Sequence, residues 1–580
     1  MRRVLTLSVA LALLLGMSPA AAGATGTEAL VTVGSPTTPF SENKQNEPAV
    51  AIDAAHPNVV VAGANDNIDL EACNAANDTT CPFTPGVGVS GVYFSFDGGK
   101  SWTQPTYTGL SARTCQGLVG NSDPPCTPVA GGSIGTLPWY FENGLISDGD
   151  PAVAFGPKPV NGVFSWANGS RLYYGNLTSN LGATRSEQRF KGFEAIAVSR
   201  TDNVGATNPP RAPTKSEWLP PVIVSKQSTT TFSDKDQVWA DNAESSPFFG
   251  NVYVCWAAFR GQEKSPNASP APLQIAVSSD GGDTWTQHQV SSAANNSNNQ
   301  PMDGCTIRTD SKGTAYIFGV ALTQGVRFEL MSRSFDGGAT WSTPDAVAGP
   351  VTQPGVVDPV LGRPVIDGVG GARSDLAFAP SVDIANGAPG GADASDRIVM
   401  TYVSGGLAKP HVFFTESANG GDTWSTPRTV EGTGDRGFYS AAAISPTGSS
   451  VYLVYNAFTT PFQSTTLTMR SLVGVVLRAA AGTSGTGAFS EIHRGAPGDP
   501  RGSSQNNLVG EFLGDYVYAA ATRSFGVAVW NDTRNAPDCQ AIDLWRLFLR
   551  GGPSAPRPAP QQNCPAAFGN SDIFSFTTAP

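Results

Sequence analysis

The chain has 580 residues, of which 65 are Gly and 45 are Pro, and only 14% of its residues are charged. With 40% hydrophobic residues it has enough apolar side chains for a core, which indicates a turn-rich globular protein and excludes a disordered one. The net charge of −11 argues against nucleic acid and against an anionic membrane surface as partners. Because no Gly period of three and no heptad run occurs, collagen and coiled coils are excluded as well.

Residues 1–22 have the pattern of a secretory signal peptide. Arg2 and Arg3 supply a positive start, Val4 to Leu15 supply an apolar run, and small residues with an Ala-x-Ala pattern end at Ala22. A membrane anchor is the alternative interpretation, but the apolar run is short for crossing a bilayer. We therefore expect cleavage after Ala22 and a secreted, extracellular protein without membrane insertion.

The eight cysteines of an exported chain are expected to form disulfides. Their spacing predicts the pairs Cys73 with Cys81, Cys115 with Cys126 and Cys539 with Cys564, and leaves Cys255 and Cys305. No Cys-x-x-Cys motif occurs and the four His residues are scattered singly, so no zinc site is expected. No cofactor is predicted, and a structural Ca²⁺ ion in the Asp/Asn-rich loops stays an open alternative.

One eight-residue phrase occurs four times. It reads Ser-Phe-Asp-Gly-Gly-Lys-Ser-Trp at 95–102 and recurs in similar form at 278–285, 334–341 and 417–424. Gly-Gly takes backbone angles closed to other residues, the Asp or Asn can bond nearby amides, and the Trp is an apolar anchor. Each copy follows a strand-like run and therefore predicts a hairpin turn. The structural residues of these turns are Asp97, Trp102, Asp280, Trp285, Asp336, Trp341, Asn419 and Trp424.

This phrase resembles the Asp box, also called the bacterial neuraminidase repeat, of sialidases and other secreted β-propellers. The resemblance implies an all-β fold, a β-propeller of four-stranded blades. A looser repeat, in which polar residues precede an apolar strand, recurs seven times and favours seven blades over the six of known sialidases. The polar entries are Asn46–Pro48, Asp148–Asp150, Asp234–Asp236, Asp303, Arg373–Asp375, Asp435–Arg436 and Gly514–Tyr516.

A single ring of this kind predicts one domain over residues 23–580, because no blade buries both of its faces alone. The segment Ala29–Val33 is expected to close the last blade as a strand. No amphipathic helix of any length is expected. Gly/Pro-rich loop insertions are predicted at 109–147, 200–221, 344–370 and 551–572.

In up-and-down blades the first strand starts and the second strand ends at the same face. The seven polar entries are therefore expected to meet in a central cup, with the Asp boxes on the opposite face. A cup lined by converging charges is the default binding site of such a fold. Asp and Arg at strand starts also cap turns or pair between blades, so a structural role is the alternative for each of them.

The resemblance to sialidases also implies roles for single residues. Sialidases use a Tyr nucleophile activated by a Glu, an Asp acid and three Arg that hold the substrate carboxylate. The phrase Arg-Gly-Phe-Tyr-Ser at 436–440 is similar to their nucleophile strand, which gives Tyr439 the nucleophile role, Asp150 (or Asp148) the acid role and Glu511 the partner role. The expected substrate-binding residues are Arg260, Arg373, Arg436, Arg534, Asp234 and Asp515.

One sialidase phrase is missing. Sialidases carry Arg-Ile-Pro on the first blade, where this chain reads Gln-Asn-Glu-Pro-Ala-Val at 45–50, and the one similar dipeptide is Arg363-Pro364. Three functions therefore stay open: a sialidase-like glycoside hydrolase, a non-catalytic propeller that binds glycan or protein, and a polysaccharide lyase. An extracellular glycan or glycoconjugate is the expected partner, and the sequence does not predict the oligomeric state.

Overall fold

The computed structural model describes residues 26–73, 81, 83–116, 126–225, 228–260, 269–291, 296, 298–368, 370–406 and 409–580. The predicted signal peptide lies outside these described residues. Strands hold 44% of the residues and helices 4%, so the all-β class is confirmed. No helix in the described part of the chain is long and apolar enough to cross a membrane.

Seven antiparallel sheets follow one another along the described chain. The first three consist of β2 (Gln45–Ile52), β3 (Val60–Asp66) and β4 (Ser90–Ser95); β8 (Ala152–Val160), β9 (Val163–Asn180), β10 (Ala195–Thr201) and β11 (Trp218–Ile223); and β12 (Thr231–Ala240), β13 (Val252–Arg260), β14 (Ser269–Ser278) and β15 (Thr286–Gln289). The next three consist of β16 (Gln300–Thr309), β17 (Ala315–Thr323), β18 (Val326–Ser334) and β19 (Asp345–Ala348); β23 (Ser381–Ile384), β24 (Ile398–Ser404), β25 (His411–Ser417) and β26 (Arg428–Thr429); and β27 (Arg436–Ile444), β28 (Ser450–Phe458), β29 (Leu472–Gly482) and β31 (Ser490–Arg494). The seventh consists of β32 (Tyr518–Ala521), β33 (Gly526–Asp532), β34 (Asp572–Thr577) and β1 (Thr27–Leu30).

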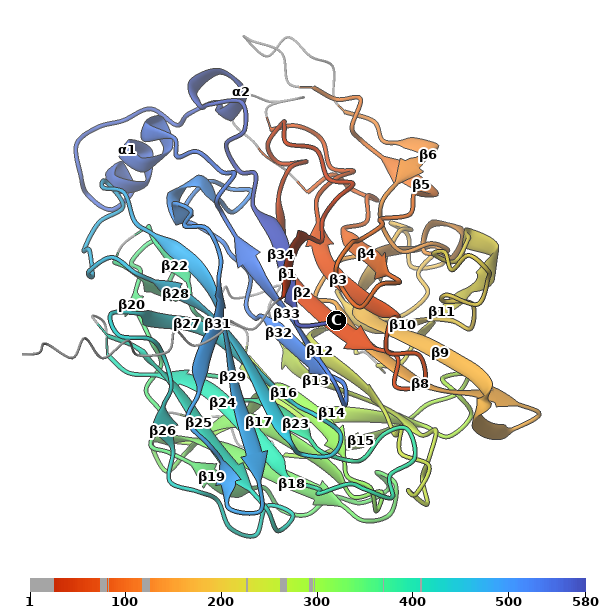
Figure 1. The fold of residues 1–580 in the computed structure, drawn as a ribbon. Coiled ribbons are helices and arrows are strands. Elements are labelled where there is room, and N and C mark those ends of the chain that lie inside the picture. Colours follow the sequence, from red (N-terminus) through yellow and green to blue (C-terminus); the bar gives the residue numbers. More distant parts are fainter. Residues whose placement is uncertain are drawn as a thin grey trace, which may run out of the picture.

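The seventh sheet joins the two ends of the described chain. Strand β1 pairs with β34, with Thr27 opposite Thr577 and Leu30 opposite Phe574, and Figure 1 shows the red β1 beside the blue β34. The strand that was expected at 29–33 to close the last blade is therefore present, slightly earlier in the sequence.

The first strands of the seven sheets form a closed series of contacts. Strand β2 contacts β8, and the contacts continue through β12, β16, β23, β27 and β32 back to β2. Seven apolar clusters fill the spaces between sheets that are neighbours in this series. One of them packs Tyr173 and Val198 of the second sheet against Val254 and Trp256 of the third. Each sheet thus buries its faces against two neighbours, which makes the core continuous.

The remaining elements lie in the long connections. Strands β7 (Leu145–Ser147) and β30 (Gly485–Thr486) extend two sheets, and two small sheets form from β5 (Tyr107–Ser111) with β6 (Val129–Ile134) and from β20 (Val356–Val357), β21 (Pro364–Ile366) and β22 (Ala372–Arg373). The helices are the 3₁₀ turns η1 (Phe141–Asn143), η2 (Lys215–Glu217) and η3 (Pro500–Gly502) and the α-helices α1 (Gln540–Phe548) and α2 (Pro560–Asn563). The expectation of no amphipathic helix is wrong for α1, which buries Ile542 and Trp545 beside the Cys539–Cys564 disulfide.

Four disulfides are present: the three predicted pairs are confirmed, and the two cysteines left over pair with each other. Cys73–Cys81, Cys115–Cys126 and Cys539–Cys564 close short loops, and Cys255 pairs with Cys305. The last of these ties β13 of the third sheet to β16 of the fourth.

The four repeated phrases form hairpin turns that share two hydrogen bonds: the first Ser donates to the Asp or Asn side chain, and that side chain accepts the amide of the seventh residue. In the turn after β14, Ser278 Oγ donates to Asp280 Oδ1 (2.7 Å), and Asp280 Oδ1 accepts the amides of Asp283 (3.0 Å) and Thr284 (2.9 Å). Both glycines have positive φ, 80° and 89°. The strand registers place this turn at the end of the sheet where β12 ends and β13 begins. Thr231, where β12 begins, lies at the other end of the sheet.

Candidate functional site

A repeated backbone irregularity lies where the first strands begin. Five residues with positive φ occupy the same position, each followed three residues later by Val or Ile. They are Glu47 (57°), Asp150 (50°), Lys235 (60°), Gly304 (61°) and Gly514 (84°). The register shifts at this point in β2, β12 and β16, which is the signature of a bulge. Left-handed backbone costs a non-glycine residue about 1–2 kcal/mol, so the first three positions keep their side chains at an energetic cost.

Glu47, Asp150 and Asp234 form a chain of hydrogen-bonded carboxyl groups. Asp150 contacts Glu47 on one side and Asp234 on the other. The Asn65 amide joins the first two, since its Nδ2 donates to Glu47 Oε2 (2.5 Å) and its Oδ1 accepts the Asp150 amide (2.8 Å). Burial and the neighbouring carboxylates raise the pKa of Asp150 and of Asp234 to about 7, and burial raises the pKa of Glu47.

Lys235 is the cation at the centre of this group. Its Nζ lies 3.6 Å from Asp150 Oδ2 and 3.6 Å from Asp234 Oδ1, and it donates to Asp515 Oδ2. Arg373 is the second cation, with NH2 3.4 Å from Asp515 Oδ2. Burial alone would raise the pKa of Asp515, but Lys235 and Arg373 lower it to about 2. The group thus holds one firmly ionised carboxylate beside carboxyls that keep protons near neutral pH. We call Glu47, Asp150, Asp234, Lys235 and Asp515 the axial site.

Tyr439 lies at the edge of the axial site. Its hydroxyl donates to the carbonyl of Arg373 (3.0 Å) and lies 3.4 Å from Asp515 Oδ1. Burial, followed by the charge of Asp515, raises the pKa of the phenol well above its usual value. Asp515 is therefore the carboxylate that the structure brings to Tyr439, and Arg373 is the arginine.

An open cavity of about 370 Å³, which we call the cup, borders the axial site. Asp234, Lys235 and Arg373 line it together with Asp303, whose pKa is raised to about 6 by burial. Asp303 and Asp234 occupy the same position on neighbouring strands, and each accepts the next residue's amide, at 2.7 and 2.9 Å. The volume and the convergent polar groups fit a small-molecule or sugar site.

Three arginines line the cup: Arg327, Arg363 and Arg373. Asp375 pairs with two of them, since its Oδ2 lies 2.7 Å from Arg373 Nε and 3.6 Å from Arg363 NH1. Arg327 lies over the ring of Phe378 and makes no ion pair with any carboxylate among the described residues. Among the cations that line the cup, Arg327 is therefore the one whose guanidinium is most available to an anionic ligand.

Three other predicted residues are held elsewhere by ion pairs. Arg436 pairs with buried Asp367 (2.6 Å), and Glu511 pairs with Arg470, both fully buried. Arg534 pairs with Asp532 (2.7 Å) and with Glu28 of β1. Asp148 is hydrogen-bonded to Ser179, and burial raises its pKa to about 7. Arg260 ends β13, and its side chain lies outside the described part of the structure.

Four residues of this region escaped the sequence analysis: Lys44, Asn65 as a bridge between carboxyls, Arg327 and Phe512. Lys44 Nζ and Arg373 Cζ each lie 4.7 Å from the ring centroid of Phe512, and burial lowers the pKa of Lys44 to about 7. None of the four stands in a repeated motif. Arg363 did carry a signal, because it belongs to the Arg-Pro dipeptide that resembles the sialidase phrase.

The candidate metal ligands among the described residues form one group, Glu71 with Cys115 and Cys126. Both cysteines are joined in a disulfide, so they offer no thiolate to a metal ion.

No protein-family model and no curated protein matches the chain. Solved structures that resemble it include the Hadza microbial sialidase Hz136 (13% identity, TM-score 0.39, 71% of this chain and 63% of that chain) and the leech intramolecular trans-sialidase (12%, 0.39, 71% and 65%). Another is the intramolecular trans-sialidase from Ruminococcus gnavus (13%, 0.40, 74% and 94%). The chain thus spans less than two thirds of the length of the first two. At these TM-scores the likeness assigns no site, and the chemistry of the cup has to be derived from its own residues.

Proposed function

We propose that the chain is a secreted β-propeller of seven blades, closed by β1, with the Asp-box turns on the face opposite the cup. The closed series of contacts among the first strands and the seven clusters between sheets support the blade count. The register of the turns supports their place at the far end of the sheets.

We further propose that the chain is a glycoside hydrolase that acts on extracellular glycans in the cup. The observation that carries this is the pair Asp234 and Asp303, two carboxyl groups on neighbouring strands that line one cavity. Glycosidases place two carboxyl groups across the scissile bond, one protonated and one ionised. Burial raises the pKa of both groups, and the hydrogen bond with Asp150 raises that of Asp234 further, so Asp234 takes the role of the acid that protonates the leaving-group oxygen and Asp303 that of the base for a water molecule.

The other residues of the axial site support this division of roles. Asp150 shares a hydrogen bond with Asp234, which favours the protonated form of Asp234, and Asp150 is itself hydrogen-bonded to Glu47. Lys235 and Arg373 keep Asp515 ionised. In this proposal Asp234 is the acid, and Asp150, which was predicted in that role, instead helps to keep the proton on Asp234. Tyr439 in the nucleophile role is the alternative mechanism, with Asp515 rather than Glu511 beside it.

An acidic sugar is the substrate class that the cup favours. Arg327 has no carboxylate partner among the described residues. Arg363 is half-exposed, and its NH1 lies 3.6 Å from Asp375 Oδ2, which is a long ion pair. Arginine binds carboxylates through two parallel hydrogen bonds, so a sialic or uronic acid carboxylate fits this wall.

The test is turnover of three fluorogenic aryl glycosides, an α-sialoside, a β-glucuronide and a β-glucoside, by the purified protein. We expect Asp234→Asn to lower kcat by about 100-fold or more, because general acid catalysis contributes roughly 10²–10⁴-fold. Asp303→Asn is expected to do the same, and Arg327→Gln to lower kcat/KM for acidic substrates only. Loss of activity in Tyr439→Phe, with activity retained in Asp303→Asn, would replace the water mechanism by the tyrosine mechanism.

A non-catalytic glycan-binding propeller is the second candidate, and one observation favours it. Arg373 and Lys235 are already paired with carboxylates, and the Tyr439 phenol is far from ionisation. The expected result for this function is no turnover of any of the three glycosides, together with saturable binding of sialyllactose or a uronide by calorimetry that Arg327→Gln weakens. Absence of both turnover and binding in the folded protein would exclude both candidates.

A further inference from the structure

A second cavity lies at the other end of the first strands, and nothing so far described uses it. It measures about 180 Å³, and residues from all seven first strands line it, including Val50, Ala154, Trp239, Arg308 and Ile444. It shares no lining residue with the cup. A small inner cavity separates the two and is bounded by Gln237 and Tyr518 on this side. We call the second cavity the exit pocket.

Loops from three sheets meet at the exit pocket. The amide of Glu244, after β12, donates to the carbonyl of Pro389, after β23 (2.8 Å), and Asn386 Nδ2 donates to Asn242 Oδ1 (2.7 Å). From the seventh sheet, Arg523 donates to the carbonyl of Gly387 (2.7 Å). These sheets are not neighbours in the ring of contacts, so the loops reach across to one another. They make the end of the axial space a bounded pocket.

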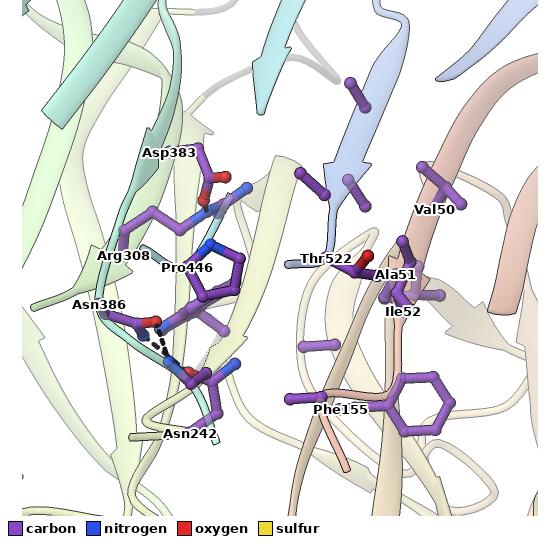
Figure 2. A pocket seen from close by; sticks show the side chains of 18 of the residues that line it. Val50, Ala51, Ile52, Phe155, Asn242, Arg308, Asp383, Asn386, Pro446 and Thr522 are labelled. Carbon is purple, nitrogen blue, oxygen red and sulfur yellow. Dashed lines mark hydrogen bonds and ion pairs between the residues drawn. The ribbon is translucent and has the colours of Figure 1, made fainter. Parts of the chain in front are cut away.

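The exit pocket has one polar and one apolar wall. Figure 2 shows Asp383, Arg308, Asn386 and Asn242 on one side and Val50, Ile52 and Phe155 on the other.

The charges of the polar wall are already compensated. Arg308 Nε lies 3.4 Å from Asp383 Oδ1, and the guanidinium lies 4.6 Å from the ring centroid of Trp239. Arg523, the remaining charged lining residue, pairs with Asp393. A charged ligand would lose its hydration without finding a free counter-charge, so the pocket favours an uncharged one.

One donor in the polar wall is free. The side-chain nitrogen of Asn242, Nδ2, makes no hydrogen bond to any described residue, while the side-chain oxygen Oδ1 accepts one from Asn386 Nδ2. An apolar cavity of roughly 150 Å³ takes up benzene, so the exit pocket has room for one ring and a short substituent. We propose that the exit pocket binds a small uncharged aromatic alcohol, with its ring against the apolar wall and its hydroxyl at Asn242.

The test uses 4-fluorobenzyl alcohol as the probe and its ¹⁹F resonance as the signal of binding. We expect saturable binding to one site of the full chain. Ala51→Leu fills the pocket from the apolar wall and should weaken binding about tenfold or more, because one extra branched side chain takes up most of a ring's space. Ala520→Leu is the second filling variant, in case the first perturbs folding, and Ala346→Leu on exposed β19 is the matched control that should bind as the wild type does.

Related probes test the chemical class. Asn242→Ala removes the hydrogen bond to the hydroxyl as well as the one from Asn386, and it should weaken binding of the alcohol about fivefold. Binding of 4-fluorotoluene, which makes no hydrogen bond at Asn242, should be unchanged. Fluorobenzoate and fluorobenzylammonium should bind more weakly than the alcohol. The proposal is overturned by non-saturable binding, by wild-type affinity in both filling variants, or by tighter binding of either charged probe.

Discussion

At the scale of single residues, the axial site separates its carboxyl groups by their surroundings. Asp515 faces two cations and has a pKa of about 2, whereas Asp150 and Asp234 face one another and have pKa values of about 7. The same residue type thus holds a charge in one place and a proton in another, within reach of a single lysine. This separation is what acid and base roles at one site require.

The raised pKa values predict a pH dependence of stability. Between pH 4 and pH 7 the folded state binds more protons at Asp150 and Asp234 than the unfolded state does, so the contribution of these two groups to the free energy of unfolding falls as pH rises through this window. In the double variant Asp150→Asn, Asp234→Asn this fall should be shallower. Denaturant unfolding at a series of pH values measures both slopes, and parallel curves for the two proteins would contradict the assigned protonation states.

At the scale of elements, the sequence predicted what is local. The hairpin turns follow from a Ser, an Asp and two Gly within a few residues, and the polar entries stand directly before apolar runs. Which of the predicted side chains reach the cup could not be predicted, because several of them are held by a partner far along the chain. Asp367 holds Arg436, Glu28 holds Arg534, and Arg470 holds Glu511. Arg327 stands within β18 with no motif around it, and only the fold brings it to the wall of the cup.

The bulge in β12 gives a prediction at this scale. Lys235→Gly and Lys235→Ala both remove the amine, but only glycine accepts a φ of 60° without strain. Since left-handed backbone costs other residues about 1–2 kcal/mol, and glycine's extra freedom in the unfolded chain offsets part of this, the Gly variant should be more stable by about 1 kcal/mol. Chemical denaturation of the two variants measures the difference. Equal stability would mean that the backbone at this position is relaxed.

At the scale of the whole molecule, the two ends of the described part of the chain meet in one sheet. Glu28 of β1 is bound by Arg534, which follows β33 of the same sheet, and by His493 of β31 in the preceding sheet (2.7 Å). These partners lower the pKa of Glu28 to about 2 against the effect of burial. Trp102, at the end of the first sheet, donates to Ser575 of β34 (3.0 Å). The seam is therefore fixed by contacts to the sheets on both sides of it. Arg534, which binds Glu28, helps to hold β1 in the seventh sheet.

Because each sheet buries its faces against two neighbours, opening this seam should weaken the entire ring. A chain that begins at Val31 lacks β1 and leaves β34 as an open edge, whereas a chain that begins at Gly26 keeps β1 and is the matched control. We expect the shorter chain to melt about 2–4 °C below the control, because a loss of a few kcal/mol shifts Tm by roughly 1 °C per kcal/mol in a protein of this size. It should also aggregate more readily through the exposed strand edge. Calorimetry and light scattering of the two chains measure these effects. Equal melting temperatures would show that β1 is not needed to hold the ring closed.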